Sequence, residues 1–176
     1  MKPGILKYSS PGNATPSHLG MKLFERQTGI ELLHVPYRSG PAAATALLRG
    51  DVDMYLAGML TIAPLVRSGA VRLLATVAPR RLASNPELAT MIELGYPELT
   101  FSDWQGIVAP AGTPREITDR LSRELANILV DADLEQHFEQ LSMERAKLGP
   151  LEFKQLIHSE IRRWDRLVRE LHVTVD

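Results

Sequence analysis

The sequence predicts an α/β fold in which a mainly parallel sheet is flanked by helices. Short apolar runs alternate with segments of helical periodicity over residues 6–95, and Gly or Pro stands at most of the joins. A repeated strand-then-helix order is typical of a parallel sheet covered on both faces. At 176 residues with 44% hydrophobic content, the chain can also form the core of one sizeable domain or two small ones.

The amino-terminal elements follow from apolar runs and capping residues. The first helix is expected to have Thr15 as its N-cap, to carry Pro16 in its first turn and to stop at Gly29. Further helices are expected from residues 40–41 to Gly50, over residues 61–68, and from residue 85 to Gly95. Strands are expected at residues 6–9, 32–35, 54–57 and 73–77.

The part of the chain after residue 101 is expected to be mainly helical. Residues 113–116 fit a capping box, and the apolar residues that follow recur every fourth position, at Ile117, Leu121, Leu125 and Leu129. A short helix with Leu134, Phe138 and Leu141 and a long helix after residue 150 come next, and strands are expected at 106–109 and, weakly, at 145–148. Two strands are too little sheet for three apolar helix faces. We therefore expect a part of this unit to be absent from the chain or supplied by a partner.

Composition excludes several classes of function. The chain has 20 Lys and Arg against 21 Asp and Glu, a net charge of −1, so no nucleic-acid partner is expected. The absence of cysteine excludes disulfides, thiolate catalysis and Cys-based zinc sites. No window reaches the roughly 20 apolar residues that span a bilayer. No basic and apolar export signal stands before the first predicted strand.

The first candidate site is the loop between the first predicted strand and helix. A polar, Gly-containing loop that opens a helix presents N–H groups and the positive end of the helix dipole, which suits a carboxylate, phosphate or sulfate. The equally weighted alternative is an ordinary turn whose Ser and Thr only cap the helix. The residues of this candidate loop are Ser10, Gly12, Asn13, Ala14 and Thr15.

A second loop of the same kind leads into the second predicted helix. Its residues Tyr37, Arg38, Ser39 and Gly40 are placed to reach a ligand held by the first loop, because parallel strands end at one edge of a sheet. Arg38 is also consistent with a solvated surface cation, the commoner fate of a lone Arg.

Catalytic and metal sites have little support in the sequence. The usual nucleophile-elbow, phosphate-loop, dinucleotide and zinc-protease motifs are absent, so no catalytic residue, metal or cofactor is expected. His18 is the nearest base for an enzyme acting at the first loop, but a His at this place in a helix more often packs or faces solvent. Asp51 and Asp53 are more typical of a turn and a strand edge than of a cation site.

Several strings, in order and spacing, resemble one family across nearly the whole chain. They are residues 2–4, 8–10, 12–13 and 18–19, HVPYR at 34–38, LLRGDVDM at 47–54, GYP at 95–97 and WQGIVAPAGTP at 104–114. With these strings the chain resembles the Bug-type periplasmic solute receptors of tripartite tricarboxylate transporters.

The resemblance implies a periplasmic-binding-protein type II-like fold whose two lobes close on a carboxylate. It implies a periplasmic location, a small organic acid as ligand, and transporter subunits in the membrane as partners. Residues 5–101 then form the second, ligand-binding lobe, and residues 102–176 form an incomplete return to the first lobe. About one hundred residues of the first lobe, which family chains normally carry, do not fit in a chain of this length.

Carried over residue by residue, the resemblance assigns ligand binding to the two loops and to Gly58. Pro11 and Ala14 depart from the small or Gly residues usual in the first loop, and Pro11 removes one N–H donor. Ala57 and Gly58 stand where an Asp and a polar neighbour are common. The resemblance therefore assigns no side-chain contact to the distal end of the ligand. The alternative function is a truncated, ligand-incompetent interaction or oligomerisation module, whose exposed apolar helix faces favour self-association or a separate partner.

Overall fold

The computed structural model of the chain describes residues 5–140, 143–171 and 173. It divides into two compact units, one formed by Met1–Asp103 with Asp165–Asp176 and the other by Trp104–Trp164. We describe each unit by itself. No helix in the described ranges is long and apolar enough to cross a membrane.

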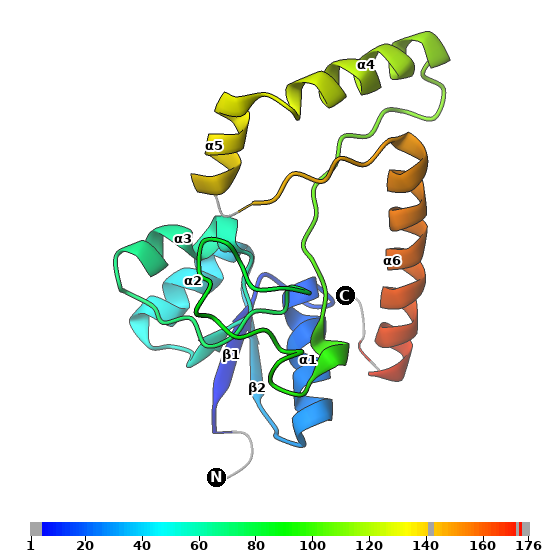
Figure 1. The fold of residues 1–176 in the computed structure, drawn as a ribbon. Helices are drawn as coiled ribbons and strands as arrows, with labels where there is room; N and C mark the ends of the chain where they lie inside the picture. Colours follow the sequence, from blue (N-terminus) through cyan, green and yellow to red (C-terminus); the bar gives the residue numbers. More distant parts are fainter. Residues whose placement is uncertain (1–4, 141–142, 172, 174–176) are drawn as a thin grey trace. The chain divides into compact units, whose positions relative to one another are not determined.

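The first unit is built on a small parallel sheet with the order β2-β1-β3. β1 (Lys7–Ser10) pairs with β2 (Leu33–Pro36) and β3 (Met54–Tyr55), and Tyr8 lies opposite His34 on one side and Met54 on the other. Helices α1 (Pro16–Thr28), α2 (Gly40–Arg49) and α3 (Met59–Arg67) follow the three strands in turn (Figure 1). The predicted α/β class and parallel pairing are confirmed.

Capping residues set the helix boundaries of this unit, with Thr15 as predicted and Ser39 as a cap that was not predicted. Thr15 caps α1 by accepting a hydrogen bond from the backbone N–H of His18, and Ser39 caps α2 by accepting one from Ala42. Gly29 and Gly50 end these helices with φ of 71° and 75°, a conformation that glycine adopts without strain. The third helix begins at Met59, two residues before its predicted start.

Two apolar clusters hold α1 against the rest of the unit. Tyr8, Met21 and Leu32 form the first cluster, which joins the sheet to α1. The second consists of Leu23, Met91 and Leu99, with Leu167 packed against it. Leu167 comes from the end of α6 (Pro150–Glu170), which explains why residues after 164 belong to the first unit. Burying side chains of this size stabilises the fold by roughly 1.5–3 kcal/mol each.

The segment 70–96 differs from its prediction. Residues 73–77 do not form a strand; Thr76 makes only an isolated parallel bridge to Thr90. The expected helix from residue 85 to Gly95 is also wrong. The N–H of Met91 donates to the carbonyl of Thr76, so it does not make the bond to residue 87 that a helix requires. A single turn starts at Thr90 instead, where Thr90 and Glu93 each accept the other's backbone N–H, as in a capping box.

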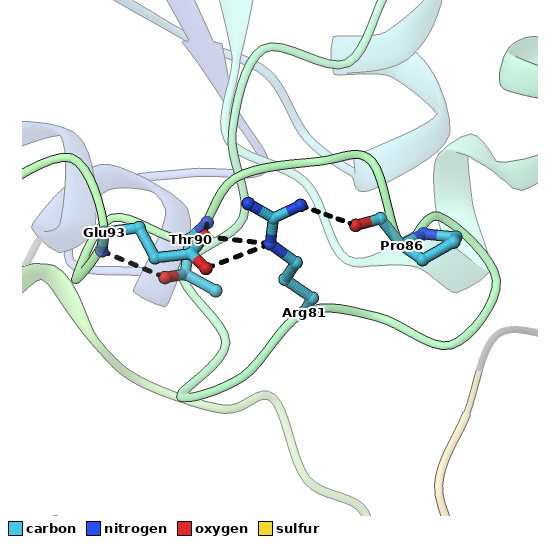
Figure 2. Close-up of polar contacts among 4 residues, drawn as sticks. All are labelled: Arg81, Pro86, Thr90 and Glu93. Carbon is cyan, nitrogen blue, oxygen red and sulfur yellow. Dashed lines mark hydrogen bonds and ion pairs between the residues drawn. The ribbon is translucent and has the colours of Figure 1, made fainter.

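A polar cluster formed by Arg81, Pro86, Thr90 and Glu93 fixes this turn (Figure 2). The Arg81 guanidinium donates to both carboxylate oxygens of Glu93, at 3.0 and 3.1 Å, and to the carbonyl of Pro86 at 2.8 Å. The backbone N–H of Thr90 and the Arg81 side chain hold the pKa of Glu93 below its usual value. The same contacts join both ends of the segment that was expected to be a helix.

The second unit is helical, with α4 (Arg115–Ile128), α5 (Ala132–Gln140) and the first part of α6. The predicted capping box at residues 113–116 is wrong, because Pro114 takes the cap position and no side chain caps α4. Residues 106–109 and 145–148 are not strands, and Ile107 and Val108 are 70% and 75% exposed. Leu141 of the expected short helix lies outside the described residues.

Candidate functional site

The candidate site lies where β1, β2 and β3 end and α1, α2 and α3 begin, which we call the carboxyl edge. Because the strands are parallel, the N-termini of all three helices point to this one edge of the sheet. None of the three helices has an acidic residue in its first turn. The strand order reverses at β1, so the loops after β1 and β3 flank the point where ligands bind in sheets of this topology.

The first loop is organised around the hydroxyl of Ser10, which is fully buried. This oxygen lies 2.7 Å from Nε2 of His34, donates to the carbonyl of Gly12 and accepts from the Gly12 N–H. Tyr37 donates its N–H to the carbonyl of Ser10, which ties the second loop to the first. Ser10 therefore positions both candidate loops, and a direct contact from it to a ligand stays a prediction.

The loop amides fall into two groups. The N–H of Gly12 bonds to Ser10 and that of Ala14 bonds to Nδ1 of His18 at 3.1 Å. The N–H groups of Thr15 and Ser17, in contrast, make no hydrogen bond within the part of the chain that the structure describes. The donors left for a ligand are thus at the start of α1: Thr15, the last residue of the predicted loop, and Ser17, two residues beyond it.

The positive φ of Ala14 identifies where the loop is strained. Its φ is 54°, the one left-handed non-glycine conformation in the described residues, and the Ala14–His18 bond holds it. Gly12, with φ of 140°, tolerates its conformation because it has no side chain. Asn13 stands between these two residues and is itself held by an interaction within the chain.

Two stacked histidine rings contact residues of the first loop, His34 at Ser10 and His18 at Ala14. The rings of His18 and His34 stack with centroids 4.0 Å apart and planes 11° apart, and Tyr8 stacks on His34 at 4.9 Å. Burial, and then the charges of His18 and Lys22, lower the pKa of His34 to about 4. Burial, followed by the charge of Lys22, also lowers the pKa of His18. Both rings are therefore neutral at pH 7.

This arrangement opposes the enzymatic alternative at the first loop. A serine 2.7 Å from an imidazole has the spacing of a nucleophile and its base. The Ser10 hydroxyl is closed off from solvent, however, and the His18 ring is only 6% exposed and accepts a backbone N–H. Neither group is placed to reach a substrate.

The second loop brings a different set of groups to the carboxyl edge. The Ser39 side chain caps α2, and Arg38 is exposed to solvent. A Cβ at Gly40 would lie 3.4 Å from the hydroxyls of both Tyr55 and Thr61, so the start of α2 lies against β3 and α3. The sequence did not single out Tyr55 or Thr61, since neither belongs to a recognisable loop pattern.

The third helix start is formed by Gly58, with Asp103 beside it. Gly58 is the N-cap of α3 and offers no side-chain hydrogen bond. A Cβ at Gly58 would lie 3.1 Å from Oδ2 of Asp103. The Ser17 hydroxyl donates to the carbonyl of Leu56 at 2.5 Å, which connects the starts of α1 and α3. The predicted residues of the two loops and Gly58 therefore meet at one edge.

Asp53, at the entry of β3, has a structural role. Oδ2 of Asp53 accepts the backbone N–H of Lys7 at 2.7 Å. Within residues 5–140, 143–171 and 173, no group of three His, Asp or Glu side chains is arranged to hold a metal ion.

Comparison with known proteins identifies the family. Residues 1–173 match the family described as "Tripartite tricarboxylate transporter family receptor". The chain is 32% identical over 175 residues to the UPF0065 protein in the tcbD-tcbE intergenic region of Pseudomonas sp. (strain P51), covering 99% of this chain and 52% of that protein. It is 31% identical over 169 residues to protein BugT of Bordetella pertussis, covering 96% and 52%.

Solved structures share the fold. The R. palustris protein Rpa4515 with adipate superposes with a TM-score of 0.91 at 26% identity, covering 98% of this chain and 58% of that one. The periplasmic binding protein BugD gives 0.86 at 26% identity, covering 97% and 57%. MatC from Rhodopseudomonas palustris with bound malate gives 0.82 at 26% identity, covering 94% and 57%.

The chain spans about half the length of the curated relatives named above. The resemblance inferred from the sequence is confirmed by the family match and by the shared fold. On this evidence the chain belongs to the tripartite tricarboxylate transporter receptor family.

Proposed function

We propose that this chain is the ligand-holding part of an extracytoplasmic receptor that captures a small carboxylate and delivers it to a tripartite tricarboxylate transporter. The observation that carries the proposal is the pair of N–H groups of Thr15 and Ser17 at the start of α1, which make no hydrogen bond among the described residues. Helix starts with free N–H groups and no acidic side chain attract anions. Adipate and malate in related structures agree with a carboxylate as that anion.

Receptor function requires binding without chemistry, and the groups at the carboxyl edge fit this requirement. The ligand is held by backbone donors and by the hydroxyls of Thr61 and Tyr55, which lie next to the start of α2. The residues predicted to bind the ligand come from the same strand-to-helix loops; they are Ser10, Gly12, Asn13, Ala14, Thr15, Tyr37, Arg38, Ser39, Gly40 and Gly58. A periplasmic location and transporter subunits as partners follow from the family and belong to the same proposal.

The test is thermal unfolding of the purified chain with adipate, malate and citrate, and with adipamide as a neutral control of equal length. A ligand at one hundred times its Kd stabilises a fold by about 2.7 kcal/mol, which raises Tm by roughly 5–10 °C in a protein of this size. We expect such a rise with at least one carboxylate and none with adipamide. No rise with any carboxylate would contradict the proposal.

Two neighbouring serines provide a matched pair of variants. Ser9 and Ser10 are both fully buried in β1, and the Ser9 hydroxyl donates to the carbonyl of Ala43, away from the loop. We expect Ser10→Ala to weaken carboxylate binding at least tenfold, because the loop loses the oxygen that organises it. We expect Ser9→Ala to lower stability by about 1 kcal/mol and to leave affinity unchanged.

Self-association is a second candidate function, favoured by the exposed apolar face of α4. Ile117, Leu121 and Ile128 are each about half exposed and recur with helical spacing. A second copy of the chain covers this face in that case. Light scattering after size exclusion tests it: a dimer that Leu121→Glu converts to a monomer supports this function, and a wild-type monomer contradicts it.

A further inference from the structure

The three helix starts at the carboxyl edge differ in charge. No acidic residue lies in the first turn of α1 or α2, and the exposed Arg38 immediately precedes the cap of α2. The start of α3 instead has a carboxylate of the chain itself beside it, since Asp103 Oδ2 lies 3.1 Å from the position of a Cβ on Gly58. The edge therefore attracts anions at one end and carries a negative charge at the other.

The backbone leading to Asp103 is anchored two residues earlier, at Phe101. The Phe101 ring is buried and packs where a Cβ on Gly20 would lie, 2.6 Å from its Cζ, while its N–H donates to the carbonyl of Val77. Asp103 follows two residues later, is exposed to solvent, and makes no ion pair or hydrogen bond within the described part of the chain. Its carboxylate therefore lies at the start of α3 and is available to a ligand.

From this charge pattern we infer that Asp103 determines which ligands the receptor accepts. A carboxylate of the ligand binds at the starts of α1 and α2, and the distal end of the ligand lies near Gly58 and Asp103. A second carboxylate there meets a like charge, which disfavours it, whereas an ammonium or amide group donates to Asp103 and binds more tightly. The preferred class is an ω-amino or ω-amido monocarboxylate. The inference rests on the proposed function, because it names the ligand class of the same site.

The same geometry explains why residue 58 is a glycine. Gly58 has φ of −69°, a conformation open to any residue, so backbone strain does not require glycine there. Any side chain would start 3.1 Å from Oδ2 of Asp103, so that the carboxylate would have to shift by a few tenths of an ångström. Glycine at position 58 thus leaves room for the Asp103 carboxylate at the start of α3. In this proposal Asp103 contacts the distal end of the ligand, because the side chains of Ala57 and Gly58 offer no polar group.

Length-matched ligands test the inference on the full chain by isothermal titration calorimetry. The probes are 6-aminohexanoate against adipate and 4-aminobutanoate against succinate, each pair differing only in the distal group. For the wild type we expect the amino ligand of at least one pair to bind at least tenfold more tightly than the diacid. In Asp103→Asn we expect this preference to fall below threefold. Asp51→Asn, which alters an exposed carboxylate after α2, should retain it.

The titration results distinguish a failure of the Asp103 inference from a failure of carboxylate capture. If diacids bind as well as or better than amino acids of equal length, or if Asp103→Asn keeps the wild-type preference, the inference is overturned and carboxylate capture stands. If no probe binds the wild type, carboxylate capture itself fails and the inference with it. Gly58→Ala provides a second check, since a displaced Asp103 should reduce the preference in the same direction as Asp103→Asn.

Discussion

Acidification should destabilise the first unit through the buried histidine pair. The His34 ring contacts the Ser10 hydroxyl and the rings of His18 and Tyr8, and its burial together with the charges of His18 and Lys22 disfavours a protonated imidazole. The pKa of His34 is about 4 in the folded chain against 6.5 for an unperturbed histidine. The unfolded state therefore binds a proton in a pH range where the folded state does not.

The sign and size of the effect follow from this difference. A group whose folded pKa is lowered contributes its stability above the unfolded pKa, and this contribution is lost as pH falls from 6.5 towards 4. At about 1.36 kcal/mol per pH unit, His34 alone removes about 2 kcal/mol of unfolding free energy between pH 7 and pH 5. His18, whose pKa is also lowered, acts in the same direction.

Urea denaturation followed by circular dichroism at pH 7 and pH 5 measures this loss. His34→Gln does not titrate but keeps a polar group near Ser10, and we expect it to reduce the pH-dependent loss by about 2 kcal/mol. His158→Gln is the matched control, because His158 is exposed on α6, and it should behave as the wild type. Equal losses for wild type and His34→Gln would refute the reasoning.

Two further substitutions test the packing around the site. A Cβ at Gly20 would lie 2.5 Å from Leu56 and 2.6 Å from Phe101, so we expect Gly20→Ala to cost about 1–2 kcal/mol in urea denaturation despite its gain in helix propensity; unchanged or higher stability would show that these side chains can yield. Glu93→Gln weakens the contact with Arg81, and we expect faster amide hydrogen exchange over residues 90–96, with unchanged exchange as the contrary result.

Local signals in the sequence were sufficient for the elements that frame the site. The caps Thr15 and Ser39 and the glycines at 29 and 50 act within one helix turn, so the residues themselves reveal where α1 and α2 begin and end. The predicted segment 85–95 failed because a bond from Met91 to the distant Thr76 decides its conformation. The strand expected at 106–109 failed because a strand needs a neighbour, and pairing is not encoded locally.

The same distinction applies to the candidate site. The loop pattern located both polar loops, because Gly, Pro, Ser and Thr next to a helix start are recognisable in sequence. It did not reveal which amides are internally bonded, since the acceptor for Ala14 is a side chain one helix turn further on. Nor did it reveal His34, which contacts Ser10 from 24 residues further along the chain. Asp103 was missed for the same reason, since it lies 45 residues (103 − 58) beyond Gly58.

Backbone amide chemical shifts measured by NMR during titration with a carboxylate test the central claim most directly. The N–H groups of Thr15 and Ser17 at the start of α1, and that of Gly40 at the start of α2, should move furthest, because hydrogen bonding to an anion shifts the amide that donates. The amides of Gly12 and Ala14, which are bonded within the loop, should move less. Saturating shifts confined to other parts of the chain would contradict anion capture at the carboxyl edge.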